Sequence, residues 1–108
     1  MMKPLLCGLL FLSAATHAQT MTGKVEKMEF GPHYRGIVAL DIEGESETVC
    51  ADNPNGFDYA FAASTEGGKL MFSALLAAQS SNKVVTILGE GVCSLITSVE
   101  DVKWMQTR

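Results

Sequence analysis

Apolar and polar side chains alternate along several short stretches of the chain, a pattern typical of β-strands with one buried face. The clearest run covers residues 34–43 and places Val38, Leu40 and Ile42 on one face of a predicted strand. Further strands are predicted over residues 21–30, 57–61, 83–88 and 98–105. In the first of these the apolar parity changes half-way, and such a change indicates a β-bulge.

A single stretch, residues 69–80, has the spacing of an amphipathic α-helix, with Ser64 or Thr65 able to cap its first amides. The apolar stripe predicted to pack against the sheet consists of Leu70, Met71, Ala74, Leu75 and Ala78. Phe72 and Leu76 lie off this stripe, and their exposure would create an apolar patch of the kind that binds a partner protein. We therefore take Phe72 and Leu76 as a candidate oligomer face.

The predicted order is three strands, one helix and two strands, so the fold class is mainly β with one helix. This β-β-β-α-β-β order fits a five-stranded Greek-key barrel like the OB-fold, with its helix between the third and fourth strands. A small α+β sheet with a covering helix has the same order and is the alternative. No internal repeat or linker divides the chain, so a single domain over residues 19–108 is predicted.

The N-terminus has the composition of a cleaved signal peptide. A positively charged start precedes the apolar residues 5–12, and small residues follow, with Thr16 and Ala18 at the positions that a signal peptidase reads. We expect cleavage before Gln19, which assigns residues 1–18 to the signal peptide. The apolar run is shorter than the roughly 20 residues that cross a bilayer. The mature protein is therefore predicted to be periplasmic or secreted, with no membrane span.

Removal of the signal peptide changes both the charge and the cysteine count. Loss of Lys3 takes the net charge from −4 to −5, and an acidic domain is a poor partner for nucleic acid or anionic lipid. Two cysteines remain, Cys50 and Cys93, and a cysteine pair in an exported chain favours a disulfide. Metal binding is the weaker alternative, because the mature chain has one histidine, His33, and no CxxC spacing.

Motifs of catalysis are absent from the sequence: it contains no GxSxG, P-loop or HExxH, so we expect neither an enzyme nor a cofactor. Asp52 and Asp58 flank a turn and are interpreted as turn-stabilising residues rather than as a catalytic carboxylate pair. Glu100 and Asp101 are expected at a solvated strand edge. Solvated positions, in preference to a cation site, are also expected for Glu43, Glu45 and Glu47.

Three segments follow one another in a distinctive order: a helix run at residues 67–79, a valine-rich strand at residues 83–89, and a glycine–cysteine segment at residues 91–93. Together with residues 34–38 and Cys50, they resemble a group of small exported bacterial proteins similar to the B subunit of subtilase cytotoxin. The resemblance implies an OB-fold and an intrachain disulfide. It also implies a tendency to form homo-oligomeric ring pentamers, whose outer faces bind sialylated glycans in the toxin itself.

The same resemblance implies a ligand site near the start of the second strand. His33, Tyr34 and Arg35 are the candidate ligand-binding residues there, although Arg35 stands where the toxin subunits favour a small hydroxyl residue. Aromatic rings stack on sugars, and Tyr34 is the ring expected to do so, whereas Tyr59 and Trp104 are expected in the core. The alternative function is a periplasmic protein-interaction or structural subunit with no glycan ligand.

Overall fold

The structure is a computed structural model that describes residues 20–44, 48–50 and 56–108. The predicted signal peptide, residues 1–18, lies outside the described residues. So do parts of the predicted acidic connection and turn, among them Glu45, Glu47, Asp52 and Asn55. None of the described helices has the length and hydropathy that a membrane crossing requires.

Strands and helix follow one another in the predicted order, which confirms a mainly β fold with one α-helix in the described part of the chain. The strands are β1 (Thr20–Glu29), β2 (Ile37–Ile42), β3 (Tyr59–Ala62), β4 (Val84–Gly89) and β5 (Glu100–Thr107). The helix α2 (Glu66–Ser80) separates β3 from β4. A short 3-10 turn, η2 (Pro32–Tyr34), separates β1 from β2.

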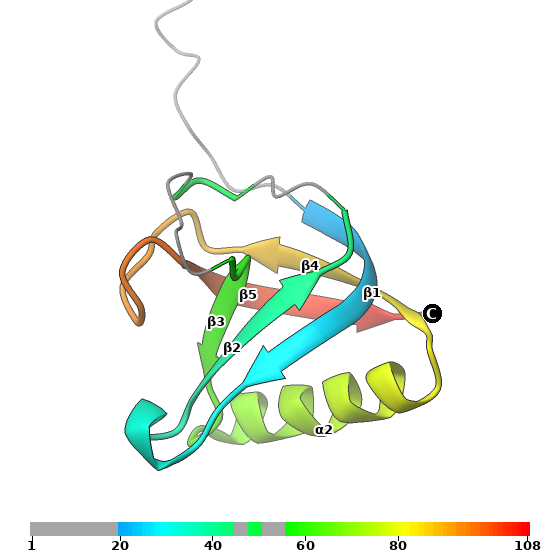
Figure 1. The fold of residues 1–108 in the computed structure, drawn as a ribbon, viewed down its shortest axis with the longest axis horizontal. Coiled ribbons are helices and arrows are strands. Elements are labelled where there is room, and N and C mark those ends of the chain that lie inside the picture. Colours follow the sequence, from blue (N-terminus) through cyan, green and yellow to red (C-terminus); the bar gives the residue numbers. More distant parts are fainter. Residues whose placement is uncertain (1–19, 45–47, 51–55) are drawn as a thin grey trace, which may run out of the picture.

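The five strands form one sheet that closes on itself (Figure 1). The strand order is β1-β2-β3-β5-β4, and β4 pairs with β1 to complete the ring. All pairs are antiparallel except β3–β5, where only the first two residues of each strand lie opposite one another. The register of β1 against β2 shifts between Val25 and Lys27, which confirms the predicted β-bulge.

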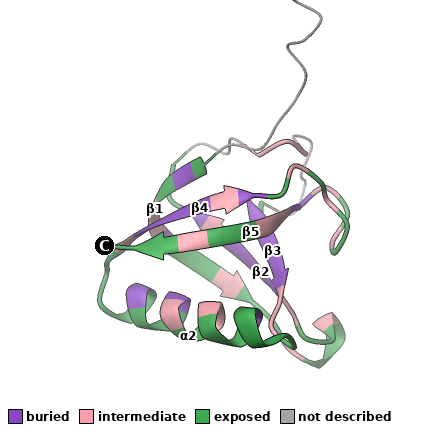
Figure 2. Ribbon diagram, turned by 180° about the vertical axis from the view of Figure 1, so that it is seen from behind, coloured by how far each residue is buried: buried purple, intermediate pink, exposed green. Residues whose placement is uncertain are grey.

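The main core lies inside the closed sheet, and α2 packs against it (Figure 2). Val38, Leu40 and Ile42 of β2 belong to this core, as their alternation predicts, and Leu75 and Ala78 of α2 complete it. Burial of these apolar side chains supplies the main favourable term in folding. The other face of β2 joins a smaller cluster made by Ala39, Phe57, Ala60 and Val99.

The core-facing side of α2 differs from the predicted stripe. The Thr65 hydroxyl accepts a hydrogen bond from the Gly68 N–H at 2.9 Å, so the helix is capped at Thr65 and begins three residues before the predicted start. The buried helix residues are Gly68, Leu75 and Ala78, whereas Leu70 is 74% exposed. Leu70 lies about 140° around the helix from Leu75, so these two residues cannot share the core face.

Candidate functional site

The predicted ligand residues His33, Tyr34 and Arg35 lie together on the turn between β1 and β2. The His33 and Tyr34 rings meet edge to face with centroids 5.5 Å apart. The Tyr34 hydroxyl donates to the Glu29 carboxylate at 3.0 Å, and this hydrogen bond raises the pKa of Tyr34. The turn thus presents an aromatic pair beside a cation.

The predicted strand start at residue 34 is wrong. Pro32 opens η2, where the fixed φ of proline suits the first helical position. Arg35 then ends the turn in the left-handed conformation, with φ 52°, and Gly36 follows with φ 87°. The chain therefore enters the sheet only at Ile37, and the candidate ligand residues stand on the turn instead of the strand.

The candidate oligomer face is split by the structure. Phe72 is half-buried and packs against two rings, Phe30 at 5.0 Å and Phe61 at 6.4 Å between centroids. Leu76, in contrast, is 40% exposed. Phe72 therefore seals the edge of the core, while Leu76 and the exposed side of Phe30 remain at the surface.

A groove of about 760 Å³ runs between α2 and β5. Leu70 and Met71 of α2 line one side, and Trp104 of β5 lines the other. Val92 and Leu95, from the connection between β4 and β5, extend the lining. Figure 2 shows β5 and α2 side by side on this face, both with exposed residues. Four of these five side chains, all but Met71, are exposed large hydrophobic residues. The groove is therefore a concave apolar surface that the sequence did not indicate.

Trp104 lines this groove because β5 contains an irregularity. Leu88 lies opposite Trp104, but Gly89 lies opposite Val102, so Lys103 is one residue in excess. As a result Val102 and Met105 both pack against the core. Trp104 is displaced from the face predicted by simple alternation and is 40% exposed, which makes its predicted core position wrong. Tyr59 is fully buried, and its predicted core position is confirmed.

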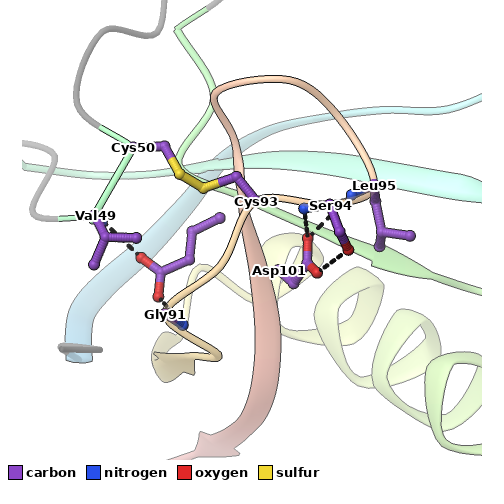
Figure 3. The surroundings of a disulfide bond; sticks show 8 residues. Val49, Cys50, Gly91, Cys93, Ser94, Leu95 and Asp101 are labelled. Carbon is purple, nitrogen blue, oxygen red and sulfur yellow. Dashed lines mark hydrogen bonds between the residues drawn. A yellow bond between two sulfur atoms is a disulfide. The ribbon is translucent and has the colours of Figure 1, made fainter. Parts of the chain in front are cut away.

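The predicted disulfide joins Cys50 to Cys93, with Cα atoms 6.6 Å apart and a sequence separation of 43 (Figure 3). This distance lies within the normal range for disulfides. In the chain-entropy model, closing a loop of this length stabilises the folded state by about 4 kcal/mol. The bond links the segment before β3 to the connection between β4 and β5, which also contributes Val92 and Leu95 to the groove.

Two neighbouring carboxylates hold the segments that carry the cysteines. Glu100 is fully buried, and its carboxylate oxygens accept the N–H groups of Val49 and Gly91, each at 2.9 Å. The predicted solvated edge is therefore wrong for Glu100, because two backbone amides replace water around its carboxylate. Figure 3 shows Val49 and Gly91 on one side of the disulfide, and Asp101 with Ser94 and Leu95 on the other.

Asp101 fixes the chain immediately after Cys93. Its carboxylate accepts the Ser94 N–H at 3.0 Å and the Leu95 N–H at 3.2 Å, and it also accepts the Ser94 hydroxyl. Charge-assisted hydrogen bonds of this kind are stronger than neutral ones. The connection that lines the groove is thus held by Asp101 and Glu100 as well as by the disulfide.

A carboxyl pair is present, but with a different partner from the one considered in the sequence. Asp58 is almost fully buried and accepts the Ile42 N–H at 2.7 Å. Its neighbour is Asp41 of β2, whereas Asp52 lies outside the described residues. Burial and the hydrogen bond to Asp58 raise the pKa of Asp41 to about 6, against a smaller opposing effect of Lys27. Asp41 therefore keeps its proton to a higher pH than an ordinary aspartate does.

Within the described residues, no three His, Cys, Asp or Glu side chains gather as a metal site would require. Comparison of the chain with protein-family models, with curated proteins and with solved structures finds no match. The resemblance to the subtilase cytotoxin group therefore stays a prediction from the sequence.

Proposed function

We propose that this chain is an exported, non-catalytic binding protein whose closed sheet is a Greek-key barrel of the OB-fold type. The ring order β1-β2-β3-β5-β4, with α2 between β3 and β4, supports the OB-fold assignment. The Cys50–Cys93 disulfide supports export, because disulfides persist in oxidising compartments.

The binding surface in this proposal is the α2–β5 groove, and the partner is a polypeptide. The observation that carries it is the exposure of Leu70, at 74%, beside the exposed Trp104 in one groove. Large apolar side chains gathered in a concave surface favour a protein partner, since binding removes them from water. Tryptophan is also among the side chains that contribute most to protein interfaces.

Site-specific photo-crosslinking tests this proposal in cells that naturally export the protein. A benzophenone amino acid replaces Leu70 in one variant and Leu76 in the other, since both leucines are exposed on α2 but only Leu70 lines the groove. We expect a discrete adduct with another polypeptide from position 70 and none from position 76. Equal adducts from both positions, or none from either, would contradict the groove as the binding surface.

A second candidate is the glycan-binding ring implied by the resemblance. The exposed turn of His33, Tyr34 and Arg35 favours it, because aromatic and cationic side chains there can contact a sugar acid. Light scattering tests the ring: a mass near five protomers supports it, and a monomer contradicts it. A sialoglycan array with Tyr34→Ala as the control variant tests the ligand, since binding unaffected by this substitution would remove the turn from the site.

A further inference from the structure

The strand β5 has a free edge where it borders the groove. Its first two residues pair with β3, but within the described part of the chain residues 102 and 104–107 pair only with β4. The strand β3 ends at Ala62, whose backbone lies against Gly68 at the start of α2. Phe61 and Ala62 of β3 also line the groove. The edge of β5 that would continue beside β3 therefore opens into the α2–β5 groove.

We propose that this edge binds an extended peptide, which pairs with β5 as an added strand and lays alternate side chains against Leu70 and Trp104. The inference rests on the proposed function and names the form that the partner takes at the same groove. An extended backbone is the ligand that satisfies a row of free amides and carbonyls in register. Residues 102–107 span about 20 Å, which matches a peptide segment of about six residues.

The edge favours a single peptide over a second copy of this chain. Lys103 lies on the edge strand at the register irregularity, and both a lysine and a bulge oppose edge-to-edge pairing of two folded sheets. The helix α2 forms the facing side of the groove, so the edge is flanked by α2 and is not open as a flat surface. A narrow strand with its own side chains fits this arrangement better than the edge of another sheet does.

Charge specifies the peptide further. Glu90, Asp101 and Lys103 line the groove, so acidic side chains outnumber basic ones there, and within the described residues the Glu90 carboxylate makes no hydrogen bond or ion pair. The whole chain carries a net charge of −4. Complementary charge accelerates association and disfavours partners of the same sign, so a basic peptide is preferred over an acidic one. We expect a partner segment with alternating apolar residues and a Lys or Arg near Glu90.

A random dodecapeptide library displayed on phage provides the probe. The library is selected on the disulfide-closed protein after removal of peptides that bind the Leu70→Glu variant, and enriched peptides are synthesised. We expect basic peptides with alternating apolar residues. Their affinity should fall at least about tenfold on Leu70→Glu and stay within about twofold on Leu76→Glu, a matched change outside the groove.

N-methylation of the peptide backbone tests the strand itself. Methyl groups on alternate residues should weaken binding at least about tenfold in one parity and little in the other, because only every second amide of a paired strand faces its neighbour. A Leu70-dependent peptide that tolerates both sets of methyl groups would overturn the added strand and leave the groove as a binding surface. Failure to enrich any groove-dependent peptide would also overturn it. If position 70 still forms crosslinks in cells, the proposed function survives that failure.

A competing outcome is self-association through the same edge. Light scattering of the purified protein gives a monomer if the occupant is a peptide from another chain. If the protein is a multimer that Leu70→Glu converts to a monomer and Leu76→Glu does not, a second copy of the chain occupies the groove. That result would overturn the proposal of a peptide ligand.

Discussion

At the scale of single residues, the buried carboxylate of Glu100 holds the chain around the disulfide. Glu100 accepts hydrogen bonds from the backbone N–H groups of Val49 and Gly91. Val49 directly precedes Cys50, and Gly91 lies two residues before Cys93. Gly89 allows this arrangement, since a Cβ at that position would overlap the Glu100 carboxylate. The sequence could not indicate this role, because the amides that surround Glu100 come from segments far from it along the chain.

Replacement of Glu100 by alanine should destabilise the fold by about 3 kcal/mol, because it leaves the amides of Val49 and Gly91 without their acceptor. Urea unfolding measures the effect. Glu90→Ala is the matched control and should change stability by less than about 0.5 kcal/mol, since Glu90 is exposed. Similar midpoints for the two variants would contradict the structural role of Glu100.

Asp41 makes stability depend on pH in a direction unusual for a carboxylate. Its pKa is raised from 3.8 to about 6 by burial and by Asp58, so between these values the folded state binds more protons than the unfolded state. The free energy of unfolding therefore falls as pH rises from about 4 to about 6. Asp41→Asn should remove this loss and raise stability above the wild type at neutral pH.

Urea unfolding of both proteins across this pH range checks the prediction for Asp41. Glu90→Gln serves as the control and should keep the wild-type slope. A wild-type slope that persists in Asp41→Asn would show that another group is responsible.

At the scale of elements, the order of strands and helix was predictable, but the rotation of α2 was not. Alternation identifies β2 because its two faces have different partners. In α2, apolar residues occur almost all round the helix, so the predicted stripe included Leu70, which the structure exposes. Gly68 determines which face of α2 is buried. A Cβ added to Gly68 would overlap the Ala62 carbonyl, so this face of the helix packs against β3. A local pattern cannot indicate such a contact between elements.

Two adjacent glycines of α2 provide a sharp test of that contact. Gly68→Ala should destabilise the protein by at least about 2 kcal/mol, because its methyl group would collide with the Ala62 backbone. Gly67→Ala meets nothing within 4 Å and should stabilise the helix by about 0.5–1 kcal/mol. Thermal unfolding of the two variants checks the opposite signs. Equal effects would contradict the described packing of α2 on β3.

The α2–β5 groove could not be predicted from the sequence for the same reason, because it also depends on contacts between elements. Trp104 is predicted in the core, but a single extra residue in β5 brings it to the groove instead. The pairing of Cys50 with Cys93 could be predicted without knowledge of the strand register, because only two cysteines remain after the predicted cleavage. Sequence patterns therefore supported the framework, while the groove depends on a bulge and on the rotation of α2.

At the scale of the whole molecule, the disulfide fastens the connection that borders the groove to the segment before β3. The double variant Cys50→Ser/Cys93→Ser should lose up to about 4 kcal/mol of stability, as expected for a loop of this length. Unfolding in urea with and without reductant measures this loss. Wild-type protein under oxidising and reducing conditions should differ by the same amount, and the double variant should not respond to reductant.

Three surfaces compete as the binding site of this chain: the turn of His33 to Arg35, the face of Phe72 and Leu76, and the α2–β5 groove. Backbone amide chemical shifts of the isotope-labelled protein, recorded while a selected dodecapeptide is added, distinguish them in one measurement. We predict the largest shifts at residues 102–107 and at Leu70, with little change elsewhere. Shifts concentrated at the turn or around Leu76, with residues 102–107 unchanged, would contradict the groove as the binding surface.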